Sequence, residues 1–219
     1  MRKLLKAWEI LKEEGLRAFL RKTTEAALNL LFEHRVNLLF QKDLKEEVTP
    51  YRAKVDVQFS FLIPDEVYLL NRSDLGYEGK SLTLAQDWLA QGVKCLVGRV
   101  KGQIVTYLWI GLKERTLAGN YQLPLGKGKA YIFKTFTTPA MRGLGLNPAC
   151  LTTALQWLRD RGYHTAYIDV NKKNIPSIKA VRKAGFKFAG TFYYIRIVKW
   201  WLTFLPSELK RSITQPSVG

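Results

Sequence analysis

The segment from Thr137 to Leu151, TTPAMRGLGLNPACL, most narrowly limits how this chain can fold. Residues 130–136 before it are mostly aromatic and β-branched, which is typical of a strand. After it, Leu155 and Leu158 continue from Leu151 at spacings of four and three residues, which predicts a helix. A turn between a strand and a helix start directs several backbone N–H groups to one point beyond the helix N-terminus. Those amides and the helix dipole together form a site for an anion.

Three residues of this turn suit a phosphate group. Gly143 and Gly145 allow the backbone to approach a phosphate because they lack a Cβ. Arg142 adds a fixed positive charge whose planar fork fits phosphate oxygens. An ordinary connection between a strand and a helix explains the same residues equally well, so the phosphate interpretation depends on a second segment.

The charge of the chain favours an anionic partner. The sequence holds 35 Lys and Arg residues against 18 Asp and Glu residues, a formal net charge of +17. Residues 1–48 are nearly balanced in charge, so the surplus belongs to residues 49–219. A positive field of this size attracts phosphorylated cofactors, nucleic acid or an acidic membrane surface, and charge alone does not choose among them.

The two cysteines and two histidines indicate neither a disulfide framework nor a metal site. Cys95 and Cys150 lie in apolar contexts without a C-x-x-C spacing, and His34 and His164 stand far apart in the sequence. A reducing, cytoplasmic compartment fits this usage. Neither a signal peptide nor a run of 18 uncharged apolar residues is evident, so we expect no transmembrane helix.

The first 48 residues are expected to form a helical hairpin, an extension that precedes the main domain. Residues 3–22 show an amphipathic pattern, and a second helix is predicted from about Glu25 to Lys42. A charged stretch followed by Pro50 marks the boundary with the main domain. Two interpretations stay open for residues 1–48: a hairpin packed on the domain, or an interfacial anchor with aromatic side chains as apolar plugs.

The remaining pattern predicts an α+β fold with one mixed sheet. Strands at 93–100 and 103–111 form a hairpin through a two-residue turn, Lys101-Gly102. The other expected elements are strands at 55–61, 130–136, 164–170, 187–190 and 192–198, and helices at 82–91, 147–161 and 175–183. We assign residues 49–205 to this domain and residues 206–219 to a polar tail.

A second informative segment follows the strand at 164–170. Asn174 can cap the helix that comes next, Pro176 fits its first turn, and Gly185 ends it. The order of strand, R-G-L-G turn, helix, strand, N-I-P-S-I helix and K-A-G-F strand start resembles the GNAT superfamily of acyl-CoA-dependent N-acetyltransferases. The resemblance covers about residues 55–198 and implies a mixed central sheet flanked by helices.

In this superfamily an R/Q-x-x-G-x-G/A turn cradles the pyrophosphate of coenzyme A (CoA), so acetyl-CoA is the implied cosubstrate. The matching positions are Arg142, Gly143, Leu144, Gly145, Leu146 and Asn147. Asn147 departs from the usual Gly or Ala. Phe136 and Thr137 match the strand whose backbone pairs with the pantetheine arm like an added strand. Asn174 matches the asparagine that contacts this arm, and we place Ser177 in the same binding segment.

The catalytic groups are less clearly marked. Superfamily members often place a tyrosine four residues before the G-F pair, where it protonates the departing thiolate, but this chain has Val181 there. Tyr193 or Tyr194 on the last strand is the candidate replacement. Asp169, at the end of the neighbouring strand, is the candidate general base, and a strand-end cap or salt bridge is the other interpretation of its carboxylate.

The resemblance implies direct transfer of an acetyl group to an amine of a small-molecule, sugar or lipid-linked (glycolipid) acceptor. The alternative is a non-catalytic module of the same fold that binds an acidic membrane surface or another anionic partner. The aromatic run from Phe192 to Leu205 fits either packing against the hairpin or a belt at a membrane interface. We therefore expect a cytoplasmic protein that can associate with a membrane, can form a homodimer and does not bind nucleic acid.

Overall fold

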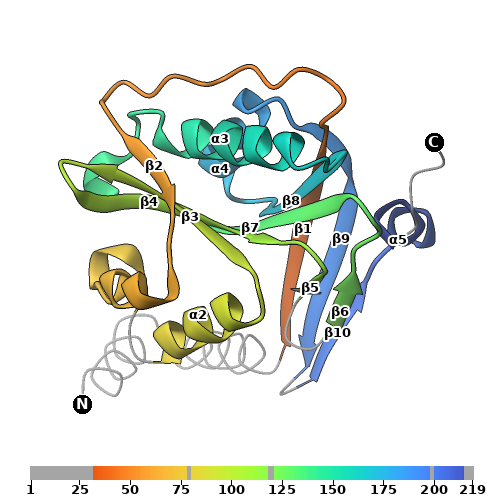
Figure 1. The fold of residues 1–219 in the computed structure, drawn as a ribbon. Coiled ribbons are helices and arrows are strands. Elements are labelled where there is room, and N and C mark those ends of the chain that lie inside the picture. Colours follow the sequence, from red (N-terminus) through yellow and green to blue (C-terminus); the bar gives the residue numbers. More distant parts are fainter. Residues whose placement is uncertain (1–31, 78–79, 118–120, 198–199, 215–219) are drawn as a thin grey trace, which may run out of the picture.

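The fold is a large mixed sheet with helices on both faces (Figure 1). A computed structural model describes residues 32–77, 80–117, 121–197 and 200–214. Its strands are β1 (Phe32–Asp43), β2 (Gln58–Phe61), β3 (Lys94–Val100), β4 (Gln103–Gly111), β5 (Glu114–Leu117), β6 (Tyr121–Pro124), β7 (Lys129–Thr137), β8 (Thr165–Asn171), β9 (Lys187–Ile197) and β10 (Trp200–Phe204). Its helices are α2 (Lys80–Ala90), α3 (Leu146–Asp160), α4 (Ile175–Lys183) and α5 (Ser207–Thr214), with short 3-10 helices η1 (Pro64–Leu70), η2 (Ser73–Leu75) and η3 (Pro139–Met141).

The large sheet contains eight strands in the order β10-β9-β1-β8-β7-β4-β3-β2. Neighbouring strands are antiparallel except β7 and β8, which run parallel. Strands β5 and β6 form a separate two-stranded sheet. This arrangement confirms the predicted α+β fold with a mixed central sheet flanked by helices.

A hydrophobic cluster lies on each face of the sheet, because successive strand residues point to opposite sides. Trp109 and Tyr131 belong to the cluster on the α2 face, where the Trp88 ring of α2 lies 5.0 Å from the Trp109 ring. Leu108 and Ile132, their neighbours in sequence, belong to the cluster on the α3 face. Figure 1 shows α3 and α4 on one side of the sheet and α2 on the other. The sheet therefore separates two hydrophobic clusters, one on the side of α2 and one on the side of α3 and α4.

Strand β1 corrects the second predicted helix. The helix expected from Glu25 to Lys42 is wrong from residue 32 onward, because this part of the chain is a strand between β9 and β8. Leu39 and Phe40 are both fully buried, one in each hydrophobic cluster. A strand covered on both faces carries apolar residues at adjacent positions, and over a short run such a pattern does not differ from that of a buried helix.

The first domain boundary changes as a consequence. Residues 32–43 belong to the same sheet as the rest of the domain, so they are not part of an extension that ends at residue 48. The helix expected at residues 3–22 lies outside the described residues. Whether residues 1–31 pack on the domain or anchor it therefore stays a prediction.

Most other predicted elements are confirmed, and the differences concern their extent. Helices α2, α3 and α4, the β3–β4 hairpin and strands β7 and β8 lie where the sequence places them. Strand β2 is shorter than the alternating pattern suggested, and the two strands expected after residue 186 are one strand, β9. The pairing of β9 with β1 shifts register at Leu39, where a bulge keeps the strand continuous. The tail expected to be only polar contains α5, which buries Leu209 and Ile213.

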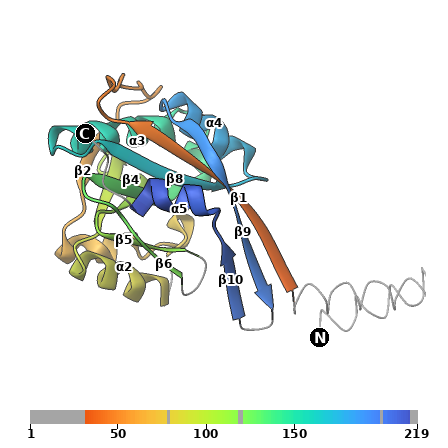
Figure 2. The ribbon, with the colours of Figure 1, turned by 90° about the vertical axis from the view of Figure 1, so that its right-hand side faces the viewer.

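Strands β1, β9 and β10 continue side by side past the rest of the sheet (Figure 2). On this extension the side chains of Tyr193, Leu202 and Phe204 are exposed. No helix in the described part of the chain is long and apolar enough to span a membrane. Association with a membrane surface and homodimer formation stay predictions.

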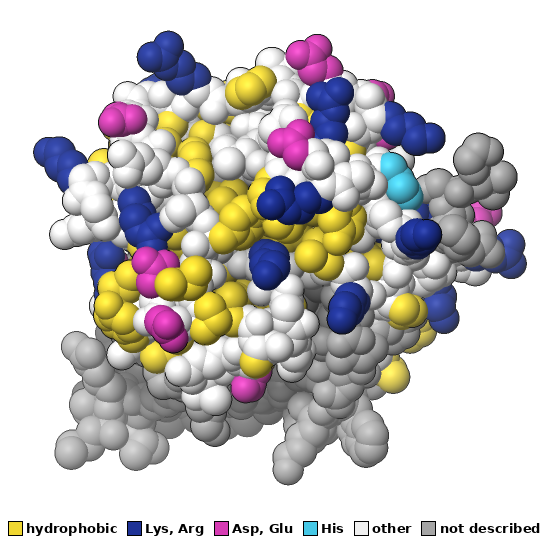
Figure 3. Space-filling model, viewed as in Figure 1, with side chains coloured by type: hydrophobic (Ala, Val, Ile, Leu, Met, Phe, Trp, Pro, Cys, Tyr) yellow, Lys and Arg dark blue, Asp and Glu magenta, His cyan; other side chains and the backbone are white. Residues whose placement is uncertain are grey.

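The surface carries charges of both signs. Figure 3 shows Lys and Arg side chains spread around a hydrophobic area on the face seen in Figure 1, with Asp and Glu side chains among them. A general positive field is thus not enough to locate a ligand site. A site needs a place where cations gather without carboxylates.

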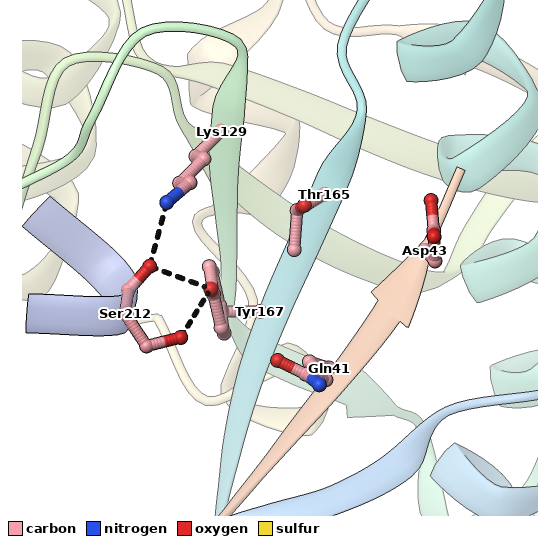
Figure 4. A pocket seen from close by; sticks show the side chains of 6 residues that line it. All are labelled: Gln41, Asp43, Lys129, Thr165, Tyr167 and Ser212. Carbon is pink, nitrogen blue, oxygen red and sulfur yellow. Dashed lines mark hydrogen bonds between the residues drawn. The ribbon is translucent and has the colours of Figure 1, made fainter. Parts of the chain in front are cut away.

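Helix α5 is fixed to the sheet through its last turn (Figure 4). The carbonyl oxygen of Ser212 accepts hydrogen bonds from Lys129 Nζ at 2.6 Å and from the Tyr167 hydroxyl at 3.1 Å. Burial lowers the pKa of the Lys129 ammonium, which nevertheless faces the negative end of the helix dipole. These bonds hold α5 beside β7 and β8.

We predict that Tyr167→Phe lowers the free energy of unfolding by about 1 kcal/mol, because the hydrogen bonds of the Tyr167 hydroxyl to the carbonyl oxygen and the Oγ of Ser212 are lost while the ring remains. Chemical denaturation measures the change. Tyr68→Phe is the matched control, since the Tyr68 side chain is 65% exposed and its change should leave stability unaltered. An equal effect of both substitutions contradicts the anchoring of α5 through Tyr167.

Candidate active site

The candidate site begins where two parallel strands part. Strands β7 and β8 pair only from Lys129 to Ile132 and from Thr165 to Ile168, although both strands continue. The edge of β7 from Thr135 to Thr137 therefore has no strand partner on its β8 side. On its other side β7 remains paired with β4. The gap leaves room for an extended ligand to run along the β7 backbone.

A groove of about 560 Å³ opens at this gap. Its walls come from the end of β7, the turn before α3, one side of α4 with its cap Asn174, and the linker between β1 and β2. The groove brings together all of the cofactor-binding residues predicted from the sequence except Leu144: Phe136, Thr137, Arg142, Gly143, Gly145, Leu146, Asn147, Asn174 and Ser177.

The turn before α3 has the backbone geometry of an anion cradle. Gly143 and Gly145 have φ values of +81° and +77°, a region that side chains with a Cβ rarely adopt. Gly145 is the N-cap of α3, and no acidic residue lies in the first turn. The first amides of a helix have no intrahelical acceptor, so those of Leu146 and Asn147 are available to a ligand. Pro148, next in the chain, has no N–H and leaves none unsatisfied.

Leu144 connects the turn to the linker between β1 and β2, and the predicted contact of its backbone N–H with a pyrophosphate stays a prediction. Its carbonyl oxygen accepts a hydrogen bond from the backbone N–H of Lys54 at 2.8 Å, and its side chain does not line the groove. The backbone N–H of Tyr51 donates to Thr152 Oγ1 at 3.1 Å. These two bonds hold the linker between β1 and β2 against the turn and α3. The linker thereby contributes Tyr51 and Lys54 to the groove, which sequence reasoning missed because they lie about 90 residues before the turn.

The groove gathers cations without carboxylates. Arg142, Lys54, Lys179 and Lys183 line it, and no Asp or Glu is among its lining residues in the described part of the chain. Arg142 Nε donates to the Thr137 carbonyl oxygen at 3.3 Å, which places the guanidinium at the end of β7. This concentration of positive charge is what a ligand with several phosphate groups requires.

Asn174 acts as the predicted cap of α4. Its Oδ1 accepts a hydrogen bond from the backbone N–H of Ser177 at 3.2 Å. The amide nitrogen of the same side chain can donate to a ligand in the groove. Val181, at the position where the resemblance implies a tyrosine, is buried in the cluster on the α3 face and supplies no hydroxyl.

Asp169 lies beside the same gap, but on the α2 face. It is the first residue of β8 after the last pair with β7. Its carboxylate accepts hydrogen bonds from Asn37 Nδ2 at 2.6 Å and from the Tyr131 hydroxyl at 3.3 Å. It makes no salt bridge with any residue that the structure describes. These contacts hold the carboxylate in one position without neutralising its charge.

Tyr193 and Tyr194 do not line the groove. Tyr193 is exposed, and its ring stacks on His34 with the ring centroids 6.0 Å apart. Tyr194 is buried on the α2 face, where its ring meets that of Phe192 edge-on. Protonation of a thiolate by either residue stays a prediction. Among the described residues, no cluster of His, Cys, Asp and Glu is arranged to hold a metal ion.

Lys134 is a residue of the gap that sequence reasoning did not single out. It has a φ of +46° at a bulge in β7, and its Nζ lies 3.8 Å from the centre of the Tyr77 ring. Its Nζ also lies 5.4 Å from the centre of the Trp88 ring. The signal in the sequence is a lysine in the middle of this strand, where residues 130–136 are otherwise mostly apolar or aromatic.

Comparison with known proteins identifies the family. A family model described as "Acetyltransferase (GNAT) family" matches residues 64–186, more than half of the chain. A mouse (Mus musculus) protein named "Probable N-acetyltransferase family 8 member 5" is 30% identical over 81 residues, which are 37% of this chain and 36% of that protein. The match thus spans about a third of the relative's length.

Solved structures share the fold. A GCN5-related N-acetyltransferase from Sphaerobacter thermophilus aligns with a TM-score of 0.54 and 14% identity, over 85% of this chain and 58% of the other. An acetyltransferase of the GNAT family from Colwellia psychrerythraea aligns with a TM-score of 0.52 and 16% identity, over 80% of this chain and 61% of the other.

The two glycines of the turn are expected to differ in their tolerance of a Cβ. Gly143→Ala should destabilise the fold by about 1 kcal/mol through its positive φ alone, because no atom lies within 4 Å of the added Cβ. Gly145→Ala should cost about 2 kcal/mol or more, because its Cβ would lie 2.9 Å from Tyr51 Cε1.

Chemical denaturation of both variants measures this difference. Gly92→Ala is the control, since Gly92 has a φ of +84° and open space around it, far from the groove. Gly92→Ala should lower the free energy of unfolding by the same amount as Gly143→Ala. Equal losses at Gly143 and Gly145 contradict the packing of Tyr51 on the turn.

Proposed function

Because the chain belongs to the acetyltransferase (GNAT) family, we propose that it transfers an acetyl group from acetyl-CoA to an amine. The observation that carries this proposal is the coincidence of two features in one groove. The parted edge of β7 and the turn with two positive-φ glycines both line it. The first suits the amide-containing pantetheine arm, and the second suits a pyrophosphate.

The residues of the groove fit CoA in its chemistry. The backbone amides at the start of α3 would bind the pyrophosphate, and the missing Cβ at Gly143 and Gly145 allows the close approach. Lys54, Lys179 and Lys183 add positive charge for the phosphate on the ribose or for the pyrophosphate, beside Arg142. Asn147 lines the groove, and its backbone N–H can serve although its side chain departs from the usual Gly or Ala.

The pantetheine arm would run along β7. Its amides can pair with the backbone from Thr135 to Thr137, and the side-chain amide of Asn174 can donate to it from the opposite wall. With its pyrophosphate at the start of α3 and its pantetheine arm along β7, acetyl-CoA would place the acetyl thioester at the gap between β7 and β8. The sheet then separates the cofactor, on the α3 face, from an acceptor that enters on the α2 face.

Asp169 is the proposed general base. Its position beside the gap on the α2 face places it near an incoming amine, and Asn37 and Tyr131 orient its carboxylate. It would receive the proton that the amine nitrogen loses as the C–N bond forms and the C–S bond breaks. The thiolate would take a proton from Tyr193, Tyr194 or solvent. Proximity and orientation supply the remaining acceleration. No observation on the described residues specifically favours a non-catalytic module.

Binding of acetyl-CoA depends on the turn. We predict that the double variant Arg142→Glu with Gly145→Asp weakens acetyl-CoA binding by about 100-fold or more, because it adds negative charge where the pyrophosphate lies. Isothermal titration calorimetry measures the dissociation constant.

A matched double variant controls for the change in net charge. Lys101→Glu with Gly102→Asp makes the same change of charge in the turn between β3 and β4, where Gly102, like Gly145, has a positive φ. It should bind acetyl-CoA as tightly as the unmodified protein. Equal weakening in both double variants contradicts a specific cradle, and absence of binding to the unmodified protein contradicts the proposed cosubstrate.

Catalysis depends on Asp169. We predict that Asp169→Asn lowers kcat at neutral pH by about 100-fold or more while leaving acetyl-CoA binding unchanged. The rate of the variant should recover as pH rises, because a larger fraction of the amine is then neutral without a base. Asp160→Asn, an exposed carboxylate at the end of α3, is the control and should keep full activity. A loss confined to stability, with unchanged kcat, contradicts this role.

A further inference from the structure

A lysine occupies the acceptor side of the gap because β7 bulges there. Tyr107 pairs with Phe136 and Trp109 with Phe133, so Lys134 and the residue after it lie opposite a single residue of β4. Phe133 and Lys134, although adjacent, both reach the Trp88 ring of α2: the Phe133 ring centre lies 5.1 Å from it and Lys134 Nζ lies 5.4 Å from it. Regular alternation would send Lys134 to the α3 face. The bulge instead turns its ammonium to the α2 face.

The ammonium of Lys134 sits in an apolar, aromatic surrounding. The Tyr77 ring beneath it is fully buried, and the Tyr77 hydroxyl already accepts a hydrogen bond from Trp109 Nε1 at 2.6 Å. The burial of Lys134 lowers the pKa of its ammonium. No carboxylate of the described residues forms a salt bridge with it. Aromatic faces attract a cation but do not replace a counter-ion.

Lys134 and Asp169 lie on the two walls of the same gap. Lys134 comes two residues after the last paired residue of β7, and Asp169 comes one residue after the last paired residue of β8. Both side chains face the α2 side, as their contacts with Tyr77 and Tyr131 show. An amine that reaches the gap from this side thus meets a carboxylate on one wall and an uncompensated cation on the other.

We propose that Lys134 binds a negatively charged group of the acceptor, so that the acceptor is an amine that carries a carboxylate or a phosphate close to its reactive nitrogen. This inference rests on the proposed acetyl transfer and names the substrate class for it. The ammonium is a point charge with three donors, and it can hold either anion. Asp169 then receives the nitrogen end of the same molecule. A neutral amine would leave the cation without a counter-ion, and a polyamine would be repelled by it.

Pairs of acceptors that differ only in the anion test the proposal. Rates of CoA release are measured with amino acids and their carboxamides, such as phenylalanine and phenylalaninamide, and with 2-aminoethyl phosphate and ethanolamine. The unmodified protein should prefer the anionic member of at least one pair in kcat/KM. A preference within the amino acid pairs indicates that the site takes a carboxylate, and a preference for 2-aminoethyl phosphate over ethanolamine indicates that it takes a phosphate.

Substitution of Lys134 should remove this preference selectively. Lys134→Met keeps a side chain of similar length without charge, and we expect it to lower kcat/KM for the anionic acceptor about 10- to 100-fold while leaving the neutral partner unchanged. Lys134→Arg should retain most of the preference. Lys94→Met, at an exposed lysine of β3, is the control and should change neither rate. Equal losses for both members of a pair, or no loss for either, overturn the proposal.

A binding measurement separates this proposal from the proposed activity. Ring currents of Tyr77 and Trp88 should shift the Lys134 methylene signals in lysine-labelled protein, and Lys134→Met identifies those signals by their disappearance. In the presence of CoA, an N-acetyl amino acid should move them and its carboxamide should not. Movement without turnover of any acceptor supports the subsite and refutes the activity. Turnover of neutral amines without movement of the Lys134 signals supports the activity and refutes the subsite.

Discussion

The parting of two parallel strands is the constraint on which the rest of the structure depends. Strands β7 and β8 pair through Ile132 and Ile168 and then separate. Buried backbone N–H and C=O groups without partners cost about 1–3 kcal/mol each, so an exposed strand edge inside a sheet is stable only where water or a ligand reaches it. The bulge opposite Leu108 adjusts β7 to this separation while its pairing with β4 continues. The bulge in β7 and the end of its pairing with β8 thus occur together, and both contribute to the gap.

The sheet divides the tasks of the site between its two faces. On the α3 face, the turn with positive-φ glycines, helix α4 and the linker that carries Tyr51 and Lys54 form a groove lined by cations. On the α2 face, Asp169 and Lys134 stand on the two walls of the gap among buried aromatic side chains. A phosphorylated donor and a small acceptor can therefore approach the same gap from opposite sides without competing for the same contacts.

The sequence predicted the local parts of the site and missed those assembled by distant segments. The turn from Arg142 to Asn147 and the cap at Asn174 were recognisable because each depends on neighbours within a few residues. Lys54 was not, because two backbone hydrogen bonds bring its linker to the turn from far away in the chain. Strand β1 was mistaken for a helix because burial on both faces removes the alternation that identifies a strand. Lys134 was missed because its side-chain orientation depends on a bulge in β7, and no residue type in the sequence predicts which face Lys134 takes at that bulge.

Backbone amide chemical shifts of isotopically labelled protein during titration with CoA test the central claim most directly. The account predicts the largest changes at the amides of Gly143, Gly145, Leu146 and Asn147, with a second group along β7 from Thr135 to Thr137. The amides of Lys101 and Gly102 should not respond, because this turn also contains positive φ values but lies outside the groove. Changes confined to residues outside the groove, with the α3 turn unaffected, would contradict the assignment of this gap as the cosubstrate site.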